Sequence, residues 1–372
     1  PFRLSMHVDD VGHTLIFGPT GSGKSVLLAM IAVQFLRYPG AQVYLFDKGG
    51  SARALTLSVQ GDYYALGTTA CAFQPLAHID AEDERRWASL WVLDLLTLEG
   101  VAVPRAVKGQ VWNALTSLAR VPRPQRTLTG YLLALQDTTL RQALEPYSTK
   151  GPHGLLLDAD HEQLRSGTFQ CFEMAQLLET PRLVPPVLAY LFHRLEQRFT
   201  GAPTLLILDE AWLYLEHPVF AAKLRDWLRT LRKQNVAVVC ATHSIADAAT
   251  SALAPILLES CPTRLFLPNP RALEPAIAAL YTSLGLNEQQ CRLLSTATPK
   301  RHYYLHSPHG ARLFELALGQ AALACCAASR PEDHALMDRL LATHGPEAFP
   351  LHFLQHKGVP DAARILKELG HA

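Results

Sequence analysis

The sequence of 372 residues lacks several features that mark particular classes of protein. It has seven cysteines but no Cys-x-x-Cys pair and no cysteine–histidine ligand spacing, which argues against a structural zinc site or a disulfide framework. Its longest nearly apolar run, residues 316–328, is shorter than the roughly 20 residues that cross a bilayer. We also find no internal repeat and no low-complexity segment. An odd number of scattered cysteines fits small buried apolar side chains in a reducing, cytosolic compartment.

Charged residues are also scarce, at 18%, and neither sign dominates, because 34 lysines and arginines face 33 aspartates and glutamates. A net charge of +1 creates no overall field that demands nucleic acid as a partner. With 49% apolar residues, the composition excludes a disordered or fibrous chain and predicts a large buried core. The chain shows no signal peptide and opens at Pro1 rather than Met, so we expect a fragment whose natural N-terminal part is missing.

The order of the apolar segments predicts an α/β core interrupted by helices. Short apolar runs at 13–17, 42–46, 168–174, 204–208, 236–241 and 263–267 alternate with helical patterns, which is typical of a mostly parallel sheet covered on both faces. Residues 303–306 and 312–316 predict a late hairpin. We expect core parts at 1–78 and 151–325, a helical insertion at 79–150 that begins with Asp80 as an N-cap, and a helical tail at 326–372 with breaks at Gly345 and Gly358.

A glycine-rich turn after the first apolar run matches G-x-x-x-x-G-K-[ST] in full. Glycines let backbone N–H groups converge on phosphate oxygens, and the helix that follows adds its positive end. The strand-turn-helix context favours a P-loop that binds ATP and Mg²⁺ over an ordinary turn, with Lys24 on the β- and γ-phosphates and the Ser25 hydroxyl on Mg²⁺. The predicted nucleotide-binding residues are Gly18, Pro19, Thr20, Gly21, Ser22, Gly23, Lys24, Ser25 and Val26.

Two acids end the apolar run at 204–208, where a parallel sheet presents its carboxyl edge. Asp209 is expected to hold Mg²⁺, and Glu210 to orient or deprotonate the attacking water. The next run ends in Thr242-His243-Ser244, where His243 or Thr242 is placed to sense the γ-phosphate or its water. The alternative is that Ser244 or Thr242 only caps the helix that begins at Ile245.

Basic residues form two further patterns. Arg225, Arg229 and Arg232 share one face of the helix predicted at 219–233, and we expect that helix to end near the active edge with no acidic stripe from its own chain. An arginine finger for a neighbouring subunit, with Arg232 ahead of Arg229, is one interpretation, and a solvated cationic face is the other. Residues 100–136 contain five basic and no acidic residues, which fits either phosphate contacts or an ordinary solvated surface. Asp47, after the second run, fits either a turn or the site.

Several segments in order resemble a known family: Val11-Gly12-His13-Thr14 before the P-loop, Phe46-Asp47-Lys48-Gly49, Phe172-Glu173-Met174, Leu208-Asp209-Glu210-Ala211-Trp212 and Ala241-Thr242-His243-Ser244. This pattern, over about residues 2–316, resembles the C-terminal ATPase domain of type IV secretion and conjugal-transfer ATPases of the TrbE/CagE-like branch. The sequence departs from that pattern at His243, where relatives generally have Gln.

The resemblance implies a RecA-like P-loop core and an ATPase motor for type IV secretion, conjugative transfer and pilus biogenesis. It further implies a hexameric ring completed in trans by Arg232, and a location in the bacterial cytoplasm at the inner membrane, with membrane docking indirect or through the missing N-terminal part. Other type IV secretion ATPases and inner-membrane channel proteins are the expected partners. Two alternatives stay open, namely a translocase that grips DNA directly and a nucleotide-dependent scaffold with little turnover.

Overall fold

The computed structural model describes residues 3–68, 71–211, 218–251 and 253–369. The chain divides into two compact units, the first made of residues 1–63, 167–173 and 199–372, and the second of residues 64–166 and 174–198. It therefore passes between the units four times, at 63/64, 166/167, 173/174 and 198/199. The second unit contains the segment 79–150 together with residues from both sides of it and the separate stretch 174–198.

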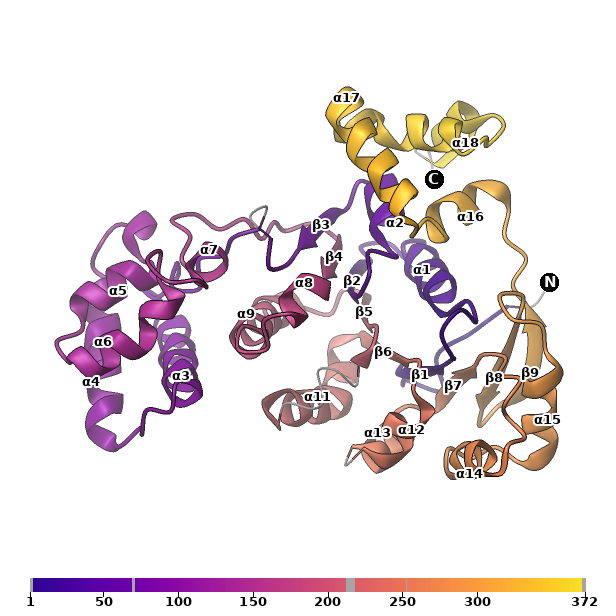
Figure 1. Cartoon of the computed structure of the whole chain (residues 1–372), viewed down its shortest axis with the longest axis horizontal. Coiled ribbons are helices and arrows are strands. Elements are labelled where there is room, and N and C mark those ends of the chain that lie inside the picture. The colour runs from indigo at the N-terminus through magenta and orange to yellow at the C-terminus, as the bar shows by residue number, and fades with distance from the viewer. Residues whose placement is uncertain (1–2, 69–70, 212–217, 252, 370–372) are drawn as a thin grey trace. The chain divides into compact units, whose positions relative to one another are not determined.

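A nine-stranded sheet runs through the first unit in the order β3-β4-β2-β5-β6-β1-β7-β8-β9, counted over the described residues (Figure 1). Strands β4, β2, β5, β6, β1 and β7 pair in parallel, and β8 and β9 add an antiparallel hairpin at one end. These pairings confirm the predicted parallel core and the late hairpin. The strands are β1 (Thr14–Phe17), β2 (Gln42–Asp47), β3 (Asp62–Ala65), β4 (Phe169–Glu173), β5 (Thr204–Leu208), β6 (Val236–Thr242), β7 (Thr263–Phe266), β8 (His302–Ser307) and β9 (Gly310–Glu315).

Helices cover both faces of the central strands, which explains why those strands are apolar throughout. Leu205 and Ile207 of β5 share one buried cluster with α1 (Lys24–Phe35) and α2 (Arg53–Ser58). On the other face, Trp227 of α11 (Pro218–Thr230) is fully buried against the ring of Phe199, which in turn contacts Tyr44 of β2. The core of the first unit therefore consists of two apolar layers, one on each side of the sheet.

The remaining helices of the first unit follow β6 or form the C-terminal tail: α12 (Ile245–Thr250), α13 (Ala254–Ser260), α14 (Pro275–Ser283), α15 (Glu288–Thr296), α16 (Gln320–Cys326), α17 (Pro331–His356) and α18 (Ala362–Leu369). The tail packs on α2, where Arg53 pairs with Asp338 at 2.5 Å. Within α17, Gly345 has a φ of 73°, so the helix breaks where the Gly-Pro pair predicted it.

The second unit is helical, as expected for 79–150. Its helices are α3 (Glu82–Leu98), α4 (Arg105–Leu118), α5 (Leu128–Ala134), α6 (Thr138–Leu144), α7 (Gly154–Leu157), α8 (Ala175–Leu178) and α9 (Val184–Glu196). The expectation that Asp80 caps the first helix is wrong, because α3 starts at Glu82 and Asp80 instead accepts from Arg126. Within the described ranges, no helix combines the length and apolar character that spanning a membrane requires.

Candidate active site

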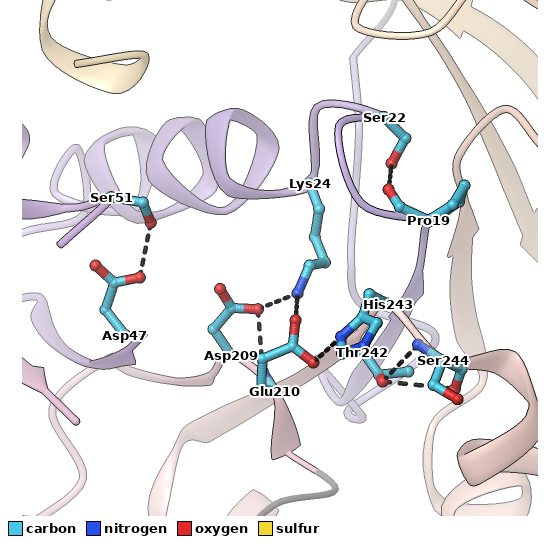
Figure 2. Close-up of polar contacts among 10 residues, drawn as sticks. All are labelled: Pro19, Ser22, Lys24, Asp47, Ser51, Asp209, Glu210, Thr242, His243 and Ser244. Carbon is cyan, nitrogen blue, oxygen red and sulfur yellow. Dashed lines mark hydrogen bonds and ion pairs between the residues drawn. The ribbon is translucent and has the colours of Figure 1, made fainter. Parts of the chain in front are cut away.

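The predicted phosphate-binding loop joins the end of β1 to the start of α1 (Figure 2). Its first residue is hydrogen-bonded to β6, the neighbour of β1 in the sheet, because the Gly18 N–H donates to the Thr242 carbonyl at 3.1 Å. The loop then closes on itself, since both the N–H and the hydroxyl of Ser22 donate to the Pro19 carbonyl, at 3.1 and 2.6 Å. Gly21 and Gly23 have φ values of 79° and 103°, a left-handed conformation that glycine adopts without steric cost.

The start of α1 offers free hydrogen-bond donors to this loop. Within the described part of the chain, no capping side chain and no carbonyl accepts from the backbone N–H groups of Lys24 and Ser25. The first turn of a helix carries such unpaired donors together with the positive end of the helix dipole. This arrangement suits an anion with several oxygens.

Lys24 connects the loop to the two acids after β5. Its ammonium group lies 2.5 Å from Asp209 Oδ1 and also contacts Glu210 Oε1, and all three side chains are largely buried (Figure 2). Burial opposes the charge on Lys24, but the two carboxylates outweigh it and raise the pKa of the lysine. Burial raises the pKa of Asp209 to about 6, although Lys24 acts in the opposite direction. The sequence therefore brings one cation and two acids together from segments far apart in the chain.

Glu210 combines an unusual backbone conformation with two side-chain partners. Its φ of 52° is a left-handed value that is uncommon outside glycine and tends to occur at functional sites. One carboxylate oxygen contacts Lys24, and the other, Oε2, lies 2.6 Å from Nδ1 of His243. Burial alone would raise the pKa of Glu210, but Lys24 and His243 together lower it. The side chain is therefore kept ionised between its two partners.

Thr242, His243 and Ser244 were considered either as sensors of the γ-phosphate or as caps of the helix that begins at Ile245. Ser244 caps α12, because its hydroxyl accepts from the Asp247 N–H at 3.1 Å, so the capping alternative is correct for this residue. Thr242 accepts from the Ser244 N–H at 3.1 Å and thereby supports the same turn. His243, about half exposed, faces Glu210 instead.

A second pair of acids lies beside this cluster and was not recognised as a pair from the sequence. Asp47 is adjacent to Asp209 because the Asp209 N–H donates to the Phe46 carbonyl at 2.9 Å. Asp47 accepts from the Ser51 hydroxyl at 2.7 Å and the Ala52 N–H at 2.9 Å, and Glu173 accepts from the Gly49 and Gly50 N–H groups at 2.9 and 2.5 Å. Burial and the nearby Glu173 raise the pKa of Asp47 to about 6. The Gly-Gly-Ser turn after β2 is the sequence signal for this arrangement.

Arg232 lies at the opposite edge of the sheet. It belongs to a 3₁₀ turn, Leu231–Gln234, that precedes β6, and Val236 pairs with Thr204 at the start of β5, whereas Asp209 follows its end. The expectation that this helix ends near the active edge is wrong, because a crossover between parallel strands must return the chain to the edge where strands begin. Arg232 also has an acidic partner in its own chain, since Nη1 lies 3.2 Å from Asp10 Oδ2. Trp212, part of the resemblance, lies outside the described residues.

Comparison with known proteins identifies relatives over nearly the whole chain, although no protein-family model matches it. The chain is 47% identical over 371 residues to the conjugal transfer protein TrbE of Rhizobium radiobacter, covering 97% of this chain and 45% of TrbE. It is 46% identical over 374 residues to the second portion of a probable conjugal transfer protein TrbE of Sinorhizobium fredii, covering 98% and 56%. The chain thus spans about half the length of these two relatives. The type IV secretion system protein VirB4 of Bartonella quintana is 31% identical over 279 residues, with coverage of 73% and 35%.

Solved structures share the fold. VirB4 of Thermoanaerobacter pseudethanolicus matches with a TM-score of 0.65 at 16% identity, covering 85% of this chain and 92% of that structure. The plasmid coupling protein TrwB in complex with ADP and Mg²⁺ matches with a TM-score of 0.51 at 15% identity, covering 82% and 85%. Together with the sheet order, these similarities confirm the expected RecA-like P-loop fold. On the strength of its sequence relatives, the chain belongs to the family of the conjugal transfer protein TrbE and the type IV secretion protein VirB4.

Proposed function

We propose that this chain hydrolyses ATP to power type IV secretion or conjugative transfer and the pilus biogenesis that accompanies it. The observation that carries the proposal is the cluster of Lys24, Asp209 and Glu210 beside a closed phosphate-binding loop. A P-loop NTPase needs a cation for the phosphates, a carboxylate for the metal and a group that orients water. The family relationship supports the cellular role, since the relatives carry the names conjugal transfer and type IV secretion protein.

The residues present fit a nucleotide with a magnesium ion. The unpaired N–H groups at the start of α1 suit phosphate oxygens, and the Ser25 hydroxyl and Asp209 would hold Mg²⁺. Bound there, the ion would neutralise charge on the phosphates.

The contacts of the free site suggest how its own residues act. Lys24 contacts both carboxylates in the free site, and we propose that it leaves at least one of them when it binds a phosphate. Glu210 is then free to orient and deprotonate water, while His243 retains its contact with the other carboxylate oxygen. A scaffold with little turnover has no use for a carboxylate held in a left-handed backbone conformation, so we favour hydrolysis over that alternative.

We further propose that the working assembly is a hexameric ring in which Arg232 completes the site of a neighbouring subunit. Arg232 lies at the edge opposite Asp209, which places it outside its own site and leaves it available to another subunit. Its contact with exposed Asp10 has to open first, and exposed ion pairs of this kind are weak. Other secretion ATPases and channel proteins at the cytoplasmic face of the inner membrane are the partners we propose, with direct DNA contact as the alternative.

The phosphate loop is tested by Lys24→Ala, with Lys48→Ala as a matched control on an exposed lysine near the same edge. A ligand that binds the folded state but not the unfolded state raises the melting temperature of the protein. We expect Mg-ATP to stabilise the unmodified chain and Lys48→Ala but not Lys24→Ala, measured by differential scanning fluorimetry. Equal stabilisation of all three proteins would refute the assignment.

The assembly is tested by mixing Arg232→Ala subunits with Lys24→Ala subunits, each inactive alone. Mixed rings pair an intact loop with an intact arginine at some interfaces, so ATP turnover should return in proportion to those interfaces. Fingers of this kind contribute about 10³–10⁵ in rate in other NTPases. An absence of recovery in rings shown to be mixed would mean that Arg232 acts within its own subunit or has no role in turnover.

A further inference from the structure

The start of β8 and the turn before it contact the phosphate-binding loop at two consecutive carbonyls. The Lys300 N–H donates to the Ser22 carbonyl at 2.8 Å, and the Tyr303 hydroxyl donates to the Gly23 carbonyl at 3.3 Å. The Gly23 carbonyl also accepts from the Leu27 N–H of α1 at 3.1 Å. Two donors from the far end of the sheet therefore fix the part of the loop that lies directly before Lys24.

These contacts set the direction of the N–H groups that face a phosphate. A trans peptide is planar, with its C=O and N–H pointing in opposite directions. When Ser22 and Gly23 turn their carbonyls toward β8, the N–H groups of Gly23 and Lys24 must point the other way. The contacts from Lys300 and Tyr303, together with the one from Leu27, therefore turn these two donors away from β8 before any ligand arrives.

The turn is itself held firmly, which allows it to serve as a support. Lys300 has a φ of 63°, a left-handed value that is costly for a residue with a side chain. His302 secures this conformation through two bonds with Thr298, since its N–H donates to the Thr298 carbonyl and its Nδ1 accepts from the Thr298 N–H, both at 3.0 Å. The strained residue is the one whose N–H reaches Ser22, so the strained conformation serves the contact with the loop.

Tyr303 is suited to hold the loop at a fixed distance. Its ring is buried and stacks on Phe314 of β9, with 5.8 Å between ring centroids. Burial raises the pKa of its hydroxyl to about 12, so the group stays a donor at neutral pH. A Cβ on Gly23 would lie only 2.7 Å from this hydroxyl, so the contact adds to its left-handed φ of 103° as a reason for glycine at this position.

We propose that Tyr303 is a positioning residue for nucleotide binding, acting through the peptide that joins Gly23 to Lys24 rather than by touching the nucleotide. The proposal rests on the proposed function, because it concerns the same phosphate loop. The proposal adds to the nucleotide site a residue outside the P-loop motif, contributed by the antiparallel end of the sheet. Lys300 contributes through its backbone N–H, which bonds to Ser22.

The test compares Tyr303→Phe with Tyr304→Phe. The two tyrosines are adjacent on β8, both are buried, and each loses one hydroxyl, but Tyr304 bonds to Gln290 rather than to the loop. For Tyr303→Phe we expect Kd for Mg-ATP to rise about fivefold, the effect of one net hydrogen bond, and KM to rise equally with kcat nearly unchanged. Tyr304→Phe should leave Kd within about twofold of the unmodified chain.

A second measurement needs no nucleotide. Amide hydrogen exchange of the peptide that covers residues 18–25 should be faster in Tyr303→Phe than in Tyr304→Phe, because the loop loses a support. Equal exchange in the two variants would overturn the inference whether or not the chain binds ATP. If the unmodified chain binds ATP and Tyr303→Phe binds it equally well, the positioning role fails while the proposed function stands. If exchange differs but no protein binds ATP, the proposed function fails instead.

Discussion

Two pairs of acids lie side by side at the carboxyl edge of the same sheet, and their carboxylates are stabilised by different kinds of partner. Asp209 and Glu210 contact the side chains of Lys24 and His243. Asp47 and Glu173 instead accept from backbone N–H groups of the turn after β2 and from the Ser51 hydroxyl. The first pair is held by the long, flexible side chain of Lys24, and the second pair by hydrogen-bond donors of the turn after β2.

This difference separates a site that exchanges partners from one that keeps them. A lysine side chain moves away by rotating about its own bonds, which leaves the carboxylates for water or a metal ion. Backbone donors move only when the turn itself unfolds. We therefore propose that the first pair takes part in the reaction and that the second pair shapes the turn after β2.

Exchanging one glutamate in each pair for glutamine should give the largest contrast. Glu210→Gln keeps the shape of the side chain but removes the base, so we expect ATP turnover to fall by ~100-fold or more while nucleotide binding persists. Glu173→Gln should keep turnover within about threefold and lower the melting temperature, because one amide oxygen replaces two carboxylate acceptors. Steady-state ATPase assays and thermal melts of both variants provide the measurement.

The proposed difference between the two acid pairs is wrong if Glu210→Gln and Glu173→Gln change ATP turnover to the same extent. Turnover within about a factor of three of the unmodified chain in Glu210→Gln would remove that residue from the reaction. A loss in Glu173→Gln that matches the loss in Glu210→Gln would show that the second pair also takes part.

The pH dependence of stability should reveal the buried carboxyl of the second pair. The pKa of Asp47 is raised to about 6 in the folded state, so the folded state binds this proton more tightly than the unfolded state. Its contribution to stability is therefore fully present below about pH 4 and is lost as pH rises through about 6. Asp47→Asn should remove a pH-dependent change of roughly 3 kcal/mol in the free energy of unfolding.

Urea unfolding of the variant and the unmodified chain at pH 5 and pH 7.5 should reveal about 1.4 kcal/mol of this change, because the remainder develops below pH 5. If both proteins change equally between the two pH values, Asp47 titrates as an ordinary carboxyl, and its turn does not impose the desolvation inferred from its burial.

The smallest effect is expected at His243, which shares Glu210 with Lys24. An amide donor can replace the imidazole, so His243→Gln should keep turnover within about threefold of the unmodified chain. His243→Ala removes the contact and should reduce turnover by roughly tenfold, because Glu210 then loses the partner that we propose it keeps when Lys24 moves to a phosphate. The ATPase assay distinguishes the two substitutions, and equal rates would show that the contact does not position Glu210.

Features of the site encoded in short stretches of sequence could be predicted. The P-loop, the strands that lead to Asp209 and His243, and the break at Gly345 all depend on neighbouring residues, such as glycines with left-handed φ values or a buried apolar run. The strands before Glu210 and His243 were expected to be neighbours, which the pairing of β5 with β6 confirms, but the contact between the two side chains was not predicted.

Other features depend on which segments meet in space. Nothing near Tyr303 in the sequence signals that its hydroxyl reaches Gly23. Glu173 reaches the Gly49-Gly50 turn because β4 pairs with β2, a pairing that residue spacing alone does not specify. The error about Arg232 has the same origin, because the edge at which a helix ends follows from the direction of the strands that it joins.

The second unit is assembled from two separate stretches of chain, residues 64–166 and 174–198, with β4 of the first unit between them in the sequence. Its helices are joined across that gap, since Trp91 of α3 donates to the Pro186 carbonyl of α9 at 3.0 Å and His193 of α9 lies 3.2 Å from Glu84 of α3. Excising residues 79–150 alone would expose the apolar face of α9. An engineered shorter chain would therefore need both stretches shortened together.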